Sequence, residues 1–426
     1  MHATSRRGFL KLAGAGAVGA AFGARSAAAQ QKTITVLHES SFIKSYDEYF
    51  KNQLAPAYEK ATGVKVVYET TSVGSLPTRV SAIAETGSGA DITMNGTLMA
   101  FQFAEKYLDV SDIAEEVGKK QGGWYPAGKE AVFVDGKWKA MPFSNIGQLM
   151  NWRTDWFAEV GFKKFPETWD ELYDAGKKLK EKGHPLGFEL GHGFGDNHGW
   201  LYPLLWSFGG HEVEADGKTV SIDSDETARA VDYCRKLFKD AILEDCLGWT
   251  DVSNNKAYLS EQISCTNNAE SILFVAKRDF PDIAKVTQQS LNPQGPKGRF
   301  HFLNPISHSI FSFSPVKEEA RAFMRWLMDE KQLGGWYAVA DSYYQPLLHG
   351  YDEAAMWTVE PRNIPYRTAL VDAHLPGWPA PPDHHLAEAV AKYVVIDMFA
   401  KACSGSSTKD VIKNAETQLK GIYRTA

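Results

Sequence analysis

The sequence predicts an α/β protein, because segments with strand and helix patterns alternate along most of the chain. Residues 54–61 carry apolar side chains at helical spacing, Gly63 is a typical helix stop, and residues 64–67 form a short run rich in valine. Residues 76–84 resume the helical spacing, and residues 91–94 form the next apolar run. This region therefore predicts one complete helix, strand, helix, strand unit.

Small polar residues follow both strands of this unit. Thr70, Thr71 and Ser72 come after the first strand, and Asn95 and Thr97 come after the second. Ligands of open α/β sheets bind outside the carboxyl ends of the strands, so these residues are candidate ligand contacts. Taken singly, each cluster also fits a helix N-cap in a solvated turn.

The other elements of the first half follow from the same periodicities. Thr168 and Glu171 have the spacing of a capping box, which predicts a helix start. In chain order we expect a strand at 33–37 that ends in residues 38–42, helices within 98–120 interrupted near Asp109, a hairpin arm at 137–143, a strand at 148–152 and the helix that follows Thr168.

The second half continues the alternation and adds two loops of unusual composition. One is rich in glycine and is expected to be exposed, and the other is rich in proline. In chain order we expect a strand at 185–190, the glycine-rich loop at 191–200, helices at 227–239 and 255–261, strands at 262–266 and 309–313, a helix at 317–328, the proline-rich link at 374–382 and a helix at 383–402.

Residues 1–29 resemble a twin-arginine export signal. Arg6 and Arg7 precede an apolar run rich in alanine and glycine, and residues 27–29 offer a cleavage site. No cysteine follows the run, so no lipid anchor is expected, and no later segment has the ~20 apolar residues that span a bilayer. We therefore expect a periplasmic protein exported by the twin-arginine pathway.

Length and charge narrow the class of protein further. Residues 1–29 hold four of the 46 basic residues and no acidic one, so the remainder has 42 basic and 52 acidic residues, a formal charge of −10. This charge disfavours nucleic acid and anionic membranes as partners. The remaining 397 residues exceed one ordinary hydrophobic core, which predicts two domains or lobes.

The four cysteines indicate neither a metal site nor a cofactor. Cys234, Cys246, Cys265 and Cys403 have no metal-finger spacing and form no CxxC motif. A bridge between Cys246 and Cys265 would suit an oxidising compartment, but the expectation we favour is separate buried thiols.

Seven segments, taken in order, carry a resemblance that covers nearly the whole chain after residue 29. They are AYEKATGVKV, SGADI, KWKAMPFSNIGQLMNW, FPETWDELYDAGKKLKEKG, AYLSEQISCTNN, SIFSFSPVKEEARAFMRWLM and ACSGSSTKDVIKNAETQLK. Their order resembles that of the family 1 extracellular solute-binding proteins of ABC importers, the group of maltose-binding protein. The resemblance implies a type II periplasmic-binding-protein fold, in which two α/β lobes, each a mixed sheet flanked by helices, are joined by hinge strands.

The resemblance also implies lobe boundaries. Lobe 1 would comprise residues 30–144 and 308–350, and lobe 2 would comprise residues 145–307 and 351–426. The family holds its solute between the lobes, on the loops that follow the strands. The ligand contacts implied in lobe 1 are Ser40, Ser41, Phe42, Thr71, Ser72, Asn95, Thr97, Tyr343, Tyr344 and Gln345. Those implied for lobe 2 are Asn145, Asp196, Asn197, His198, Asn268, Glu270 and Trp378.

Side chains of this kind suit a solute with many hydroxyl groups. A hydroxyl both donates and accepts hydrogen bonds, so amides, carboxylates and imidazoles pair well with it, and aromatic rings stack on apolar sugar faces. Trp378 is the candidate stacking ring in a loop. After Asn268, the family usually has a glycine that is often followed by an aromatic residue, whereas this chain has Ala269, Glu270 and Ser271. The stacking platform is therefore expected elsewhere in the chain.

A metal site is the first alternative. His192, His198 and Asp196 belong to one glycine-rich loop, residues 384–385 are both histidine, and the tyrosines at 343–344 resemble the tyrosine pairs of ferric-binding proteins. Several such ligands would have to converge on one ion.

Other organic solutes are a second alternative. A polyamine would require several carboxylates, for which Asp196 and Glu270 are the candidates. A glycerol-phosphate-type solute would require an arginine such as Arg79 or Arg367, neither of which lies at a predicted strand end.

A secreted glycoside-acting enzyme is a third alternative, and no catalytic motif supports it. Ser307 and His308 are adjacent, but G-x-S-x-G is absent and no paired-carboxylate motif is evident. The sequence therefore predicts a monomeric periplasmic binding component of an ABC importer, without enzyme activity or cofactor. It would deliver a carbohydrate or sugar-like glycoside to the permease subunits and would not insert into the membrane.

Overall fold

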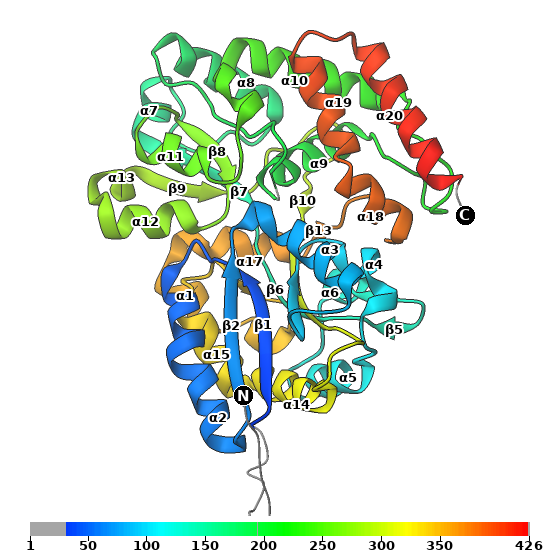
Figure 1. Ribbon diagram of the computed structural model, residues 1–426. Helices are drawn as coiled ribbons and strands as arrows, with labels where there is room; N and C mark the ends of the chain where they lie inside the picture. The colour runs from blue at the N-terminus through cyan, green and yellow to red at the C-terminus, as the bar shows by residue number, and fades with distance from the viewer. Residues whose placement is uncertain (1–30, 194, 425–426) are drawn as a thin grey trace, which may run out of the picture. The chain divides into compact units, whose positions relative to one another are not determined.

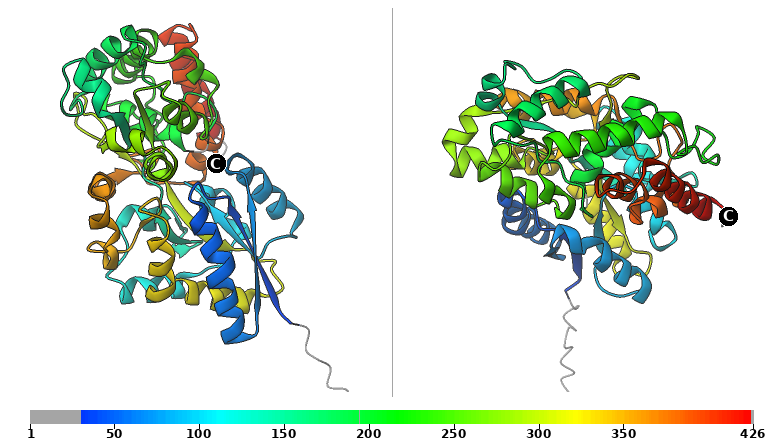
Figure 2. Two further views of the ribbon diagram at one scale, coloured as in Figure 1. Left: turned by 90° about the vertical axis from the view of Figure 1, so that its left-hand side faces the viewer. Right: turned by 90° about the horizontal axis from the view of Figure 1, so that it is seen from above.

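The structure, a computed structural model, describes residues 31–193 and 195–424, and residues from Lys32 onward form one compact unit. The predicted export signal lies outside the described residues. Two large hydrophobic cores divide this unit. We use lobe 1 for the elements around the first core and lobe 2 for those around the second; Figures 1 and 2 show the two groups of elements.

Lobe 1 is built on a six-stranded mixed sheet in the order β12-β6-β11-β3-β1-β2. β1 pairs in parallel with β2 and β3, and β11 pairs antiparallel with β3 and β6. The strands are β1 Thr33–Glu39, β2 Lys65–Thr71, β3 Ile92–Asn95, β6 Met141–Asn145, β11 Pro305–Ile310 and β12 Gln345–Pro346.

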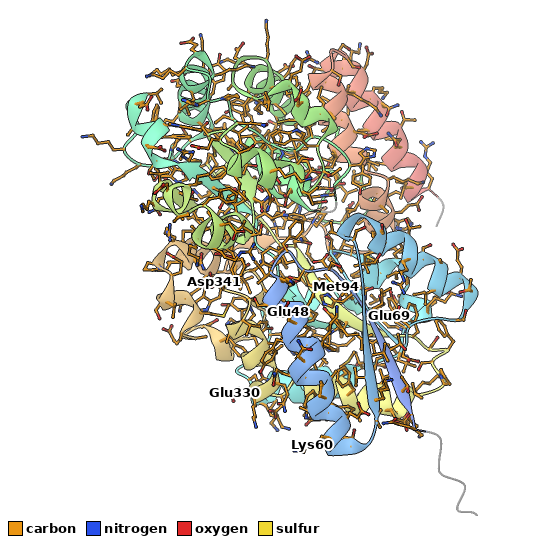
Figure 3. The ribbon with its side chains drawn as sticks, turned by 60° about the vertical axis from the view of Figure 1, so that its left-hand side comes forward. Glu48, Lys60, Glu69, Met94, Glu330 and Asp341 are labelled. Carbon is orange, nitrogen blue, oxygen red and sulfur yellow. The ribbon has the colours of Figure 1, made fainter. Side chains whose placement is uncertain are left out.

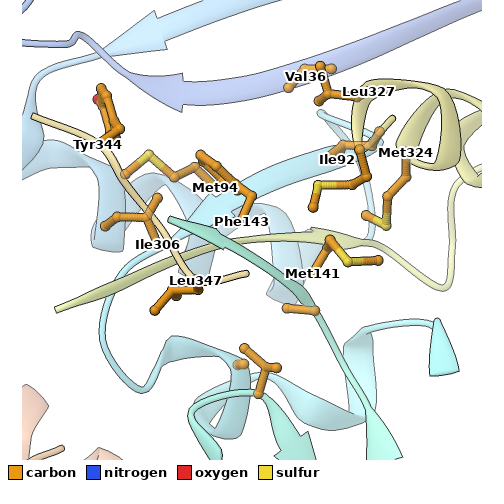
Figure 4. Packing of buried hydrophobic residues seen from close by; sticks show 14 of the residues in the cluster. Val36, Ile92, Met94, Met141, Phe143, Ile306, Met324, Leu327, Tyr344 and Leu347 are labelled. Carbon is orange, nitrogen blue, oxygen red and sulfur yellow. The ribbon is translucent and has the colours of Figure 1, made fainter. Parts of the chain in front are cut away.

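Helices cover this sheet and close the first core. They are α1 Lys44–Tyr49, the π-helical turn η1 Phe50–Leu54, α2 Ala55–Thr62, α3 Leu76–Thr86, α4 Met99–Gln102, α5 Ser111–Lys120, α6 Pro126–Glu130, α14 Lys317–Leu327 and α15 Glu330–Ala338. Between them, Val36, Ile92, Phe143 and Ile306 pack from neighbouring strands (Figure 4). A small hairpin pairs β4 Phe133–Val134 with β5 Lys137–Trp138.

Lobe 2 is built on a three-stranded antiparallel sheet in the order β8-β7-β9. The strands are β7 Leu149–Arg153, β8 Cys265–Asn268 and β9 Thr287–Ser290. Helices α7 Thr154–Glu159, α8 Trp169–Glu181, α9 Asp196–Phe208, α10 Asp225–Ala241, α11 Ser253–Leu259, α12 Ser271–Asp279, α13 Pro281–Val286, α19 Val394–Cys403 and α20 Thr408–Tyr423 surround it.

Short elements complete the described chain. They are β10 His301–Phe302, which pairs with β13 Ala373–His374, the helices α16 Met356–Val359, α17 Ile364–Leu370 and α18 His384–Ala391, and the 3-10 turns η2 Val73–Ser75, η3 Ala104–Lys106, η4 Glu244–Gly248, η5 His349–Tyr351 and η6 Pro361–Asn363. No helix among the described residues combines the length and the apolar character that crossing a membrane requires.

One edge of the lobe 1 sheet collects the ends of most of its strands. Glu39 lies opposite Thr71 in the β1–β2 register, and Asn145 lies opposite both Pro305 and Gln345. β6 ends at Asn145, and β7 of lobe 2 begins four residues later, at Leu149. This edge is therefore where the chain passes between the lobes.

Several predicted elements are confirmed. The first three strands and the helix α3 appear where periodicity places them, and Gly63 ends α2 with a φ of 74°. The capping box is complete, because the backbone N–H of Glu171 donates to Thr168 Oγ1 (3.1 Å) while the Glu171 carboxylate accepts from the backbone N–H of Thr168 (3.1 Å).

Other predicted elements differ. Residues 185–190 form no strand; only Leu186 makes a β-bridge, and the side chains of Ile263 and Trp249 fill the space beside Gly187. The strands expected at 262–266 and 309–313 are shifted, to β8 and β11. The single helix expected at 383–402 is two helices, α18 and α19, separated at Tyr393, whose φ is +55°.

The glycine-rich loop also differs from expectation, because most of it is not exposed. Gly193, Gly195 and Gly199 are buried, and α9 already begins at Asp196. A Cβ atom at Gly195 would lie 2.7 Å from Gln148 Nε2, and one at Gly199 would lie 2.4 Å from Gln148 Oε1. Glycine is thus required here for close packing against residues 146–148, which connect β6 to β7 and which we call the crossing segment.

The four cysteines are free thiols, as the favoured expectation had it for Cys246 and Cys265. Two others meet across helices: Cys234 Sγ of α10 lies 3.8 Å from Cys403 Sγ of α19. The contact fixes the end of α19 beside α10.

Candidate functional site

A small enclosed cavity lies where the sheet edge of lobe 1 meets lobe 2. It measures about 30 Å³, enough for one or two water molecules. Its lining comes from both lobes and comprises Glu39, Phe42, Val73, Ile146, Gln148, Gly195, Asp196, Asp251, Asn255, Asn268, Ala269, Ser271, Asn304, Ile306 and Tyr343. A solute of sugar size would therefore need the walls to separate.

Asp196, in the first turn of α9, is the centre of a hydrogen-bond network beside the cavity. Its Oδ1 accepts from Gln148 Nε2 (2.7 Å), and its Oδ2 accepts from Asn254 Nδ2 (2.7 Å) and Asn268 Nδ2 (2.9 Å). These donors belong to the crossing segment, to α11 and to the end of β8. One carboxylate thus ties three separate segments of the cleft wall together.

Two more buried carboxylates lie next to Asp196. One oxygen each of Glu189, Asp196 and Asp251 lie within 4.8 Å of one another. Asp251 Oδ1 accepts from the backbone N–H groups of Gly195 (2.9 Å) and Asp196 (3.2 Å). Burial, followed by the charge of Asp251, raises the pKa of Asp196 and of Glu189 well above the ordinary values.

Glu39 brings a carboxyl group from the opposite lobe. It is the last residue of β1 and is only 2% exposed. Burial, followed by the charges of Asp251 and Asp47, raises the pKa of Glu39 to about 8. At neutral pH its carboxyl is therefore mainly protonated and can donate a hydrogen bond.

Replacing Glu39 with glutamine is expected to change how stability depends on pH. A carboxyl whose pKa rises from 4.5 to about 8 on folding stabilises the fold fully below pH 4.5, and this contribution is lost as the pH rises through 8. Glutamine does not titrate, so the variant should gain on the order of 5 kcal/mol of stability relative to the wild type between these limits. Urea unfolding across this pH range measures the difference, and a constant difference would contradict the assignment.

A larger groove of about 570 Å³ lies between α3 and α4 on one side and α18 on the other, and His198 of α9 also lines it. His198 and Tyr393 line it from lobe 2, and Thr97 lines it from lobe 1. The His198 ring is 4% exposed, and neither ring nitrogen has a hydrogen-bond partner among the described residues. Burial lowers the pKa of His198 to about 3, so the ring is neutral near pH 7.

Tyr393 is an aromatic residue of the groove lining that the sequence analysis did not identify as a candidate stacking platform. Its side chain is half-buried and stacks on His192, with ring centroids 4.3 Å apart and planes 8° apart. Its left-handed backbone, at a φ of +55°, is costly for a residue with a Cβ atom, and such strain concentrates at binding sites.

A hydrogen bond between the side chains of Asn145 and Gln345 connects the segments that pass between the lobes. We call this pair the amide lock. Gln345 Oε1 accepts from Asn145 Nδ2 (2.7 Å) and from the backbone N–H of Gly147 (2.9 Å). Asn145 Oδ1 accepts from the backbone N–H of Asn304 (2.8 Å). Asn145 and Gln345 were expected as ligand contacts, but in the structure neither lines the cavity, because their polar groups already bind each other.

An ion pair also joins the lobes. Lys277 of α12 binds Asp341, which follows α15 and is labelled in Figure 3, and Lys277 Nζ lies 3.8 Å from a Glu270 carboxylate oxygen. Glu270 was expected as a ligand contact. It is fully buried beside Lys277 and does not line the cavity.

The other predicted contacts divide into groups. Phe42, Asp196, Asn268 and Tyr343 line the cavity, and Thr97 and His198 line the larger groove. The remaining residues bind their own surroundings. Ser41 accepts from the backbone N–H of Ile43, Ser72 donates to Ser75, Ser40 N–H donates to the Thr71 carbonyl, Asn95 donates to Ser309, Asn197 donates to the Gly191 carbonyl, and Tyr344 stacks on Tyr46.

Trp378 lies elsewhere. It stacks on His374, with ring centroids 4.5 Å apart, and lines a separate groove of about 410 Å³ next to α6. Trp378 therefore does not line the cavity.

The sequence reasoning missed several lining residues. Asp251 and Asn304 lie in loops. Glu189, which lies beside Asp196 and Asp251 without lining the cavity, belongs to the segment predicted as a strand. Only position in three dimensions brings them to the site. A signal existed for Glu39, which directly precedes the polar residues after the first strand.

A polar cavity between two α/β lobes, joined by crossing segments, defines a two-lobed binding protein. Residues 53–364 match the family of the bacterial extracellular solute-binding proteins, and the chain belongs to this family. A binding protein of Brucella abortus (strain 2308) is 22% identical over 409 residues, covering 93% of this chain and 95% of that one.

Solved structures share the fold. The solute-binding protein of an ABC transporter from Thermotoga lettingae, bound with α-D-tagatose, superposes with a TM-score of 0.81 at 17% identity, covering 92% of this chain and all of that one. The GacH receptor of Streptomyces glaucescens, solved unliganded and with acarbose, gives a TM-score of 0.78 at 18% identity, covering 93% of this chain and 99% of that one.

Proposed function

We propose that this protein captures a carbohydrate or sugar-like glycoside between its two lobes and delivers it to the permease of an ABC importer. The single observation that carries the proposal is the cavity lined from both lobes by carboxylates, amides and aromatic rings. These groups match the hydroxyls and the apolar face of a sugar. The fold shared with receptors for acarbose and tagatose supports the same solute class.

The lobe boundaries of the sequence analysis, 30–144 with 308–350 and 145–307 with 351–426, remain part of this proposal. Binding would follow a population shift. The solute touches both walls only in the closed arrangement, so its binding free energy favours closure, and the permease can distinguish loaded from empty protein.

The remaining features of the proposal follow from the family and from the sequence. The protein acts in the periplasm after export by the twin-arginine pathway, as a monomer, without enzyme activity or cofactor. Its partners are the solute and the permease subunits, with neither nucleic acid nor inserted membrane contacts.

Tryptophan fluorescence and thermal shift across a panel of sugars and glycosides test this function. A saturable change with at least one sugar is expected, because binding brings the lobes together around the solute. Flat responses to the whole panel, with a response to a metal ion, would exclude the sugar assignment in favour of the metal alternative.

Replacing Tyr393 with glycine is expected to weaken sugar binding at least tenfold without lowering the thermal midpoint. The ring lines the larger groove and would stack on the sugar, while glycine relieves the left-handed backbone. Tyr393→Phe keeps the ring and serves as the matched control, with affinity near that of the wild type. Equal affinity of the glycine variant and the wild type would remove Tyr393 from the site.

The polyamine alternative gains one observation. The sequence offered Asp196 and Glu270 as pocket carboxylates, whereas the cavity is lined by Glu39, Asp196 and Asp251. An aliphatic diamine therefore belongs in the same panel.

A further inference from the structure

The titratable groups that line the cavity are all acids. Glu39 of lobe 1 faces Asp196 and Asp251 of lobe 2, and the described residues of the lining include no lysine, arginine or histidine. A neutral sugar needs both donors and acceptors around it, but it does not need three carboxylates in one small cavity. Burial raises the pKa of Glu39 and of Asp196, and a positive charge between these acids would favour their ionised forms. The excess of acidic groups in the cavity therefore points to a positively charged group on the solute.

A fourth carboxylate supports this independently. Glu189 is fully buried, and neither of its oxygens has a hydrogen-bond partner of good geometry among the described residues. A Cβ atom at Gly193 would lie 1.9 Å from Glu189 Oε1, so the loop packs tightly over this carboxylate and holds it against Asp196 and Asp251. Burial raises the pKa of Glu189, so its ionised form is costly in the buried site unless a positive charge nearby stabilises it.

The groups facing this cluster do not compensate it. Asp47 lies on the Glu39 side and adds negative charge, and Tyr343, Tyr344 and Tyr393 are neutral phenols at neutral pH. Mutual repulsion therefore opposes closure of the lobes unless protons or a cation are taken up.

We propose that the solute carries a protonated amine, and that this ammonium group lies between Glu39, Asp196 and Asp251 when the lobes close. The inference rests on the proposed function and narrows its solute class to amino sugars and related aminated glycosides. Glu189 lies behind the lining, and once the ammonium group favours its ionised form it adds negative potential at the ammonium position.

The hydrogen-bond geometry favours an ammonium group over a metal ion. Calcium takes six to eight oxygen ligands. Both oxygens of Asp196 already accept side-chain amide donors, and Asp251 Oδ1 accepts two backbone N–H groups. An ammonium group has only three N–H donors to place, and Asp196 Oδ1, which accepts one side-chain donor, has a second lone pair that can accept one of them.

Matched sugar pairs test the inference on the purified protein. Calorimetry compares glucose with glucosamine, galactose with galactosamine, and cellobiose with its diamino counterpart, at a pH below the pKa of the sugar amines. Calcium and an aliphatic diamine are measured alongside. The variants are Asp251→Asn, Glu189→Gln and, as a matched control, Glu212→Gln, which alters a buried lobe 2 glutamate outside the cavity lining.

At least one amino sugar is expected to bind ten times or more tightly than its neutral partner. Asp251→Asn and Glu189→Gln should each reduce this preference at least threefold, and Glu212→Gln should leave it unchanged. Because Glu189 does not line the cavity, its effect reports charge and not lost contact.

Three results would overturn either the inference or the proposed function on which it rests, and these results can be told apart. Neutral sugars that bind as tightly as amino sugars would overturn the inference and leave the proposed function standing. Binding of the diamine but of no sugar would keep the positive charge and overturn the sugar assignment. A response to calcium alone, or to none of these compounds, would overturn both.

Discussion

Asp196→Ala is expected to abolish measurable solute binding and to lower the free energy of unfolding by about 3 kcal/mol or more. The carboxylate accepts from Gln148, Asn254 and Asn268. Alanine would leave Gln148 Nε2 without an acceptor and would remove one of the two acceptors of Asn254 Nδ2 and of Asn268 Nδ2. Each buried polar group that loses its partner costs about 1–3 kcal/mol. Because the three donors come from different segments, the cleft wall should also lose its shape, and affinity should fall at least a hundredfold.

Chemical denaturation and calorimetry on the same preparation measure both effects. Asp245→Ala is the matched control, because Asp245 is an exposed aspartate of lobe 2. Asp196→Asn preserves the size of the side chain and should fall between the two variants. Affinity within threefold of the wild type in Asp196→Ala would show that the network does not shape the site.

Gln345→Leu is expected to destabilise the protein by about 2–4 kcal/mol and to weaken binding. Leucine has a similar volume but leaves Asn145 Nδ2 and the Gly147 N–H without an acceptor in a buried crossing segment. The space beside Gly147 is tight, since a Cβ there would lie 2.5 Å from Gln345 Oε1, so rearrangement is restricted.

Urea unfolding measures the loss of stability, and Gln53→Leu, at an exposed position of η1, is the control. The ligand-induced fluorescence change should shrink in Gln345→Leu, because the lock aligns the two segments that cross between the lobes. Unchanged unfolding would mean that the amide lock is dispensable.

The sequence predicted elements with strong local signals. Helix α3 and the strands of its unit have clear periodicity, and the capping box at Thr168 and Glu171 fixes a helix start by short-range hydrogen bonds. Helix α9 was missed because its residues are almost all buried, so it has no polar face and no amphipathic period.

The candidate site was partly predictable for the same reason. Phe42, Asp196 and Asn268 lie after β1, at the start of α9 and at the end of β8, where strand-end reasoning places ligand contacts. Small hydroxyl residues such as Ser72 satisfied their local turns instead. Asp251 and Tyr393 have no local pattern, since only tertiary packing brings a loop and a helix break to the cleft.

The break between α18 and α19 has a mechanical consequence. Helix α19 packs on α10 and α20, and its last residue, Cys403, contacts Cys234, whereas α18 contacts both α4 of lobe 1 and α20 of lobe 2. Helix α18 therefore connects the two lobes beside the groove that it lines together with Tyr393. Separation of the lobes must break the contact of α18 with α4 or its contact with α20, and in the second case α18 would rotate about Tyr393, so the backbone that presents the Tyr393 ring would also be the pivot.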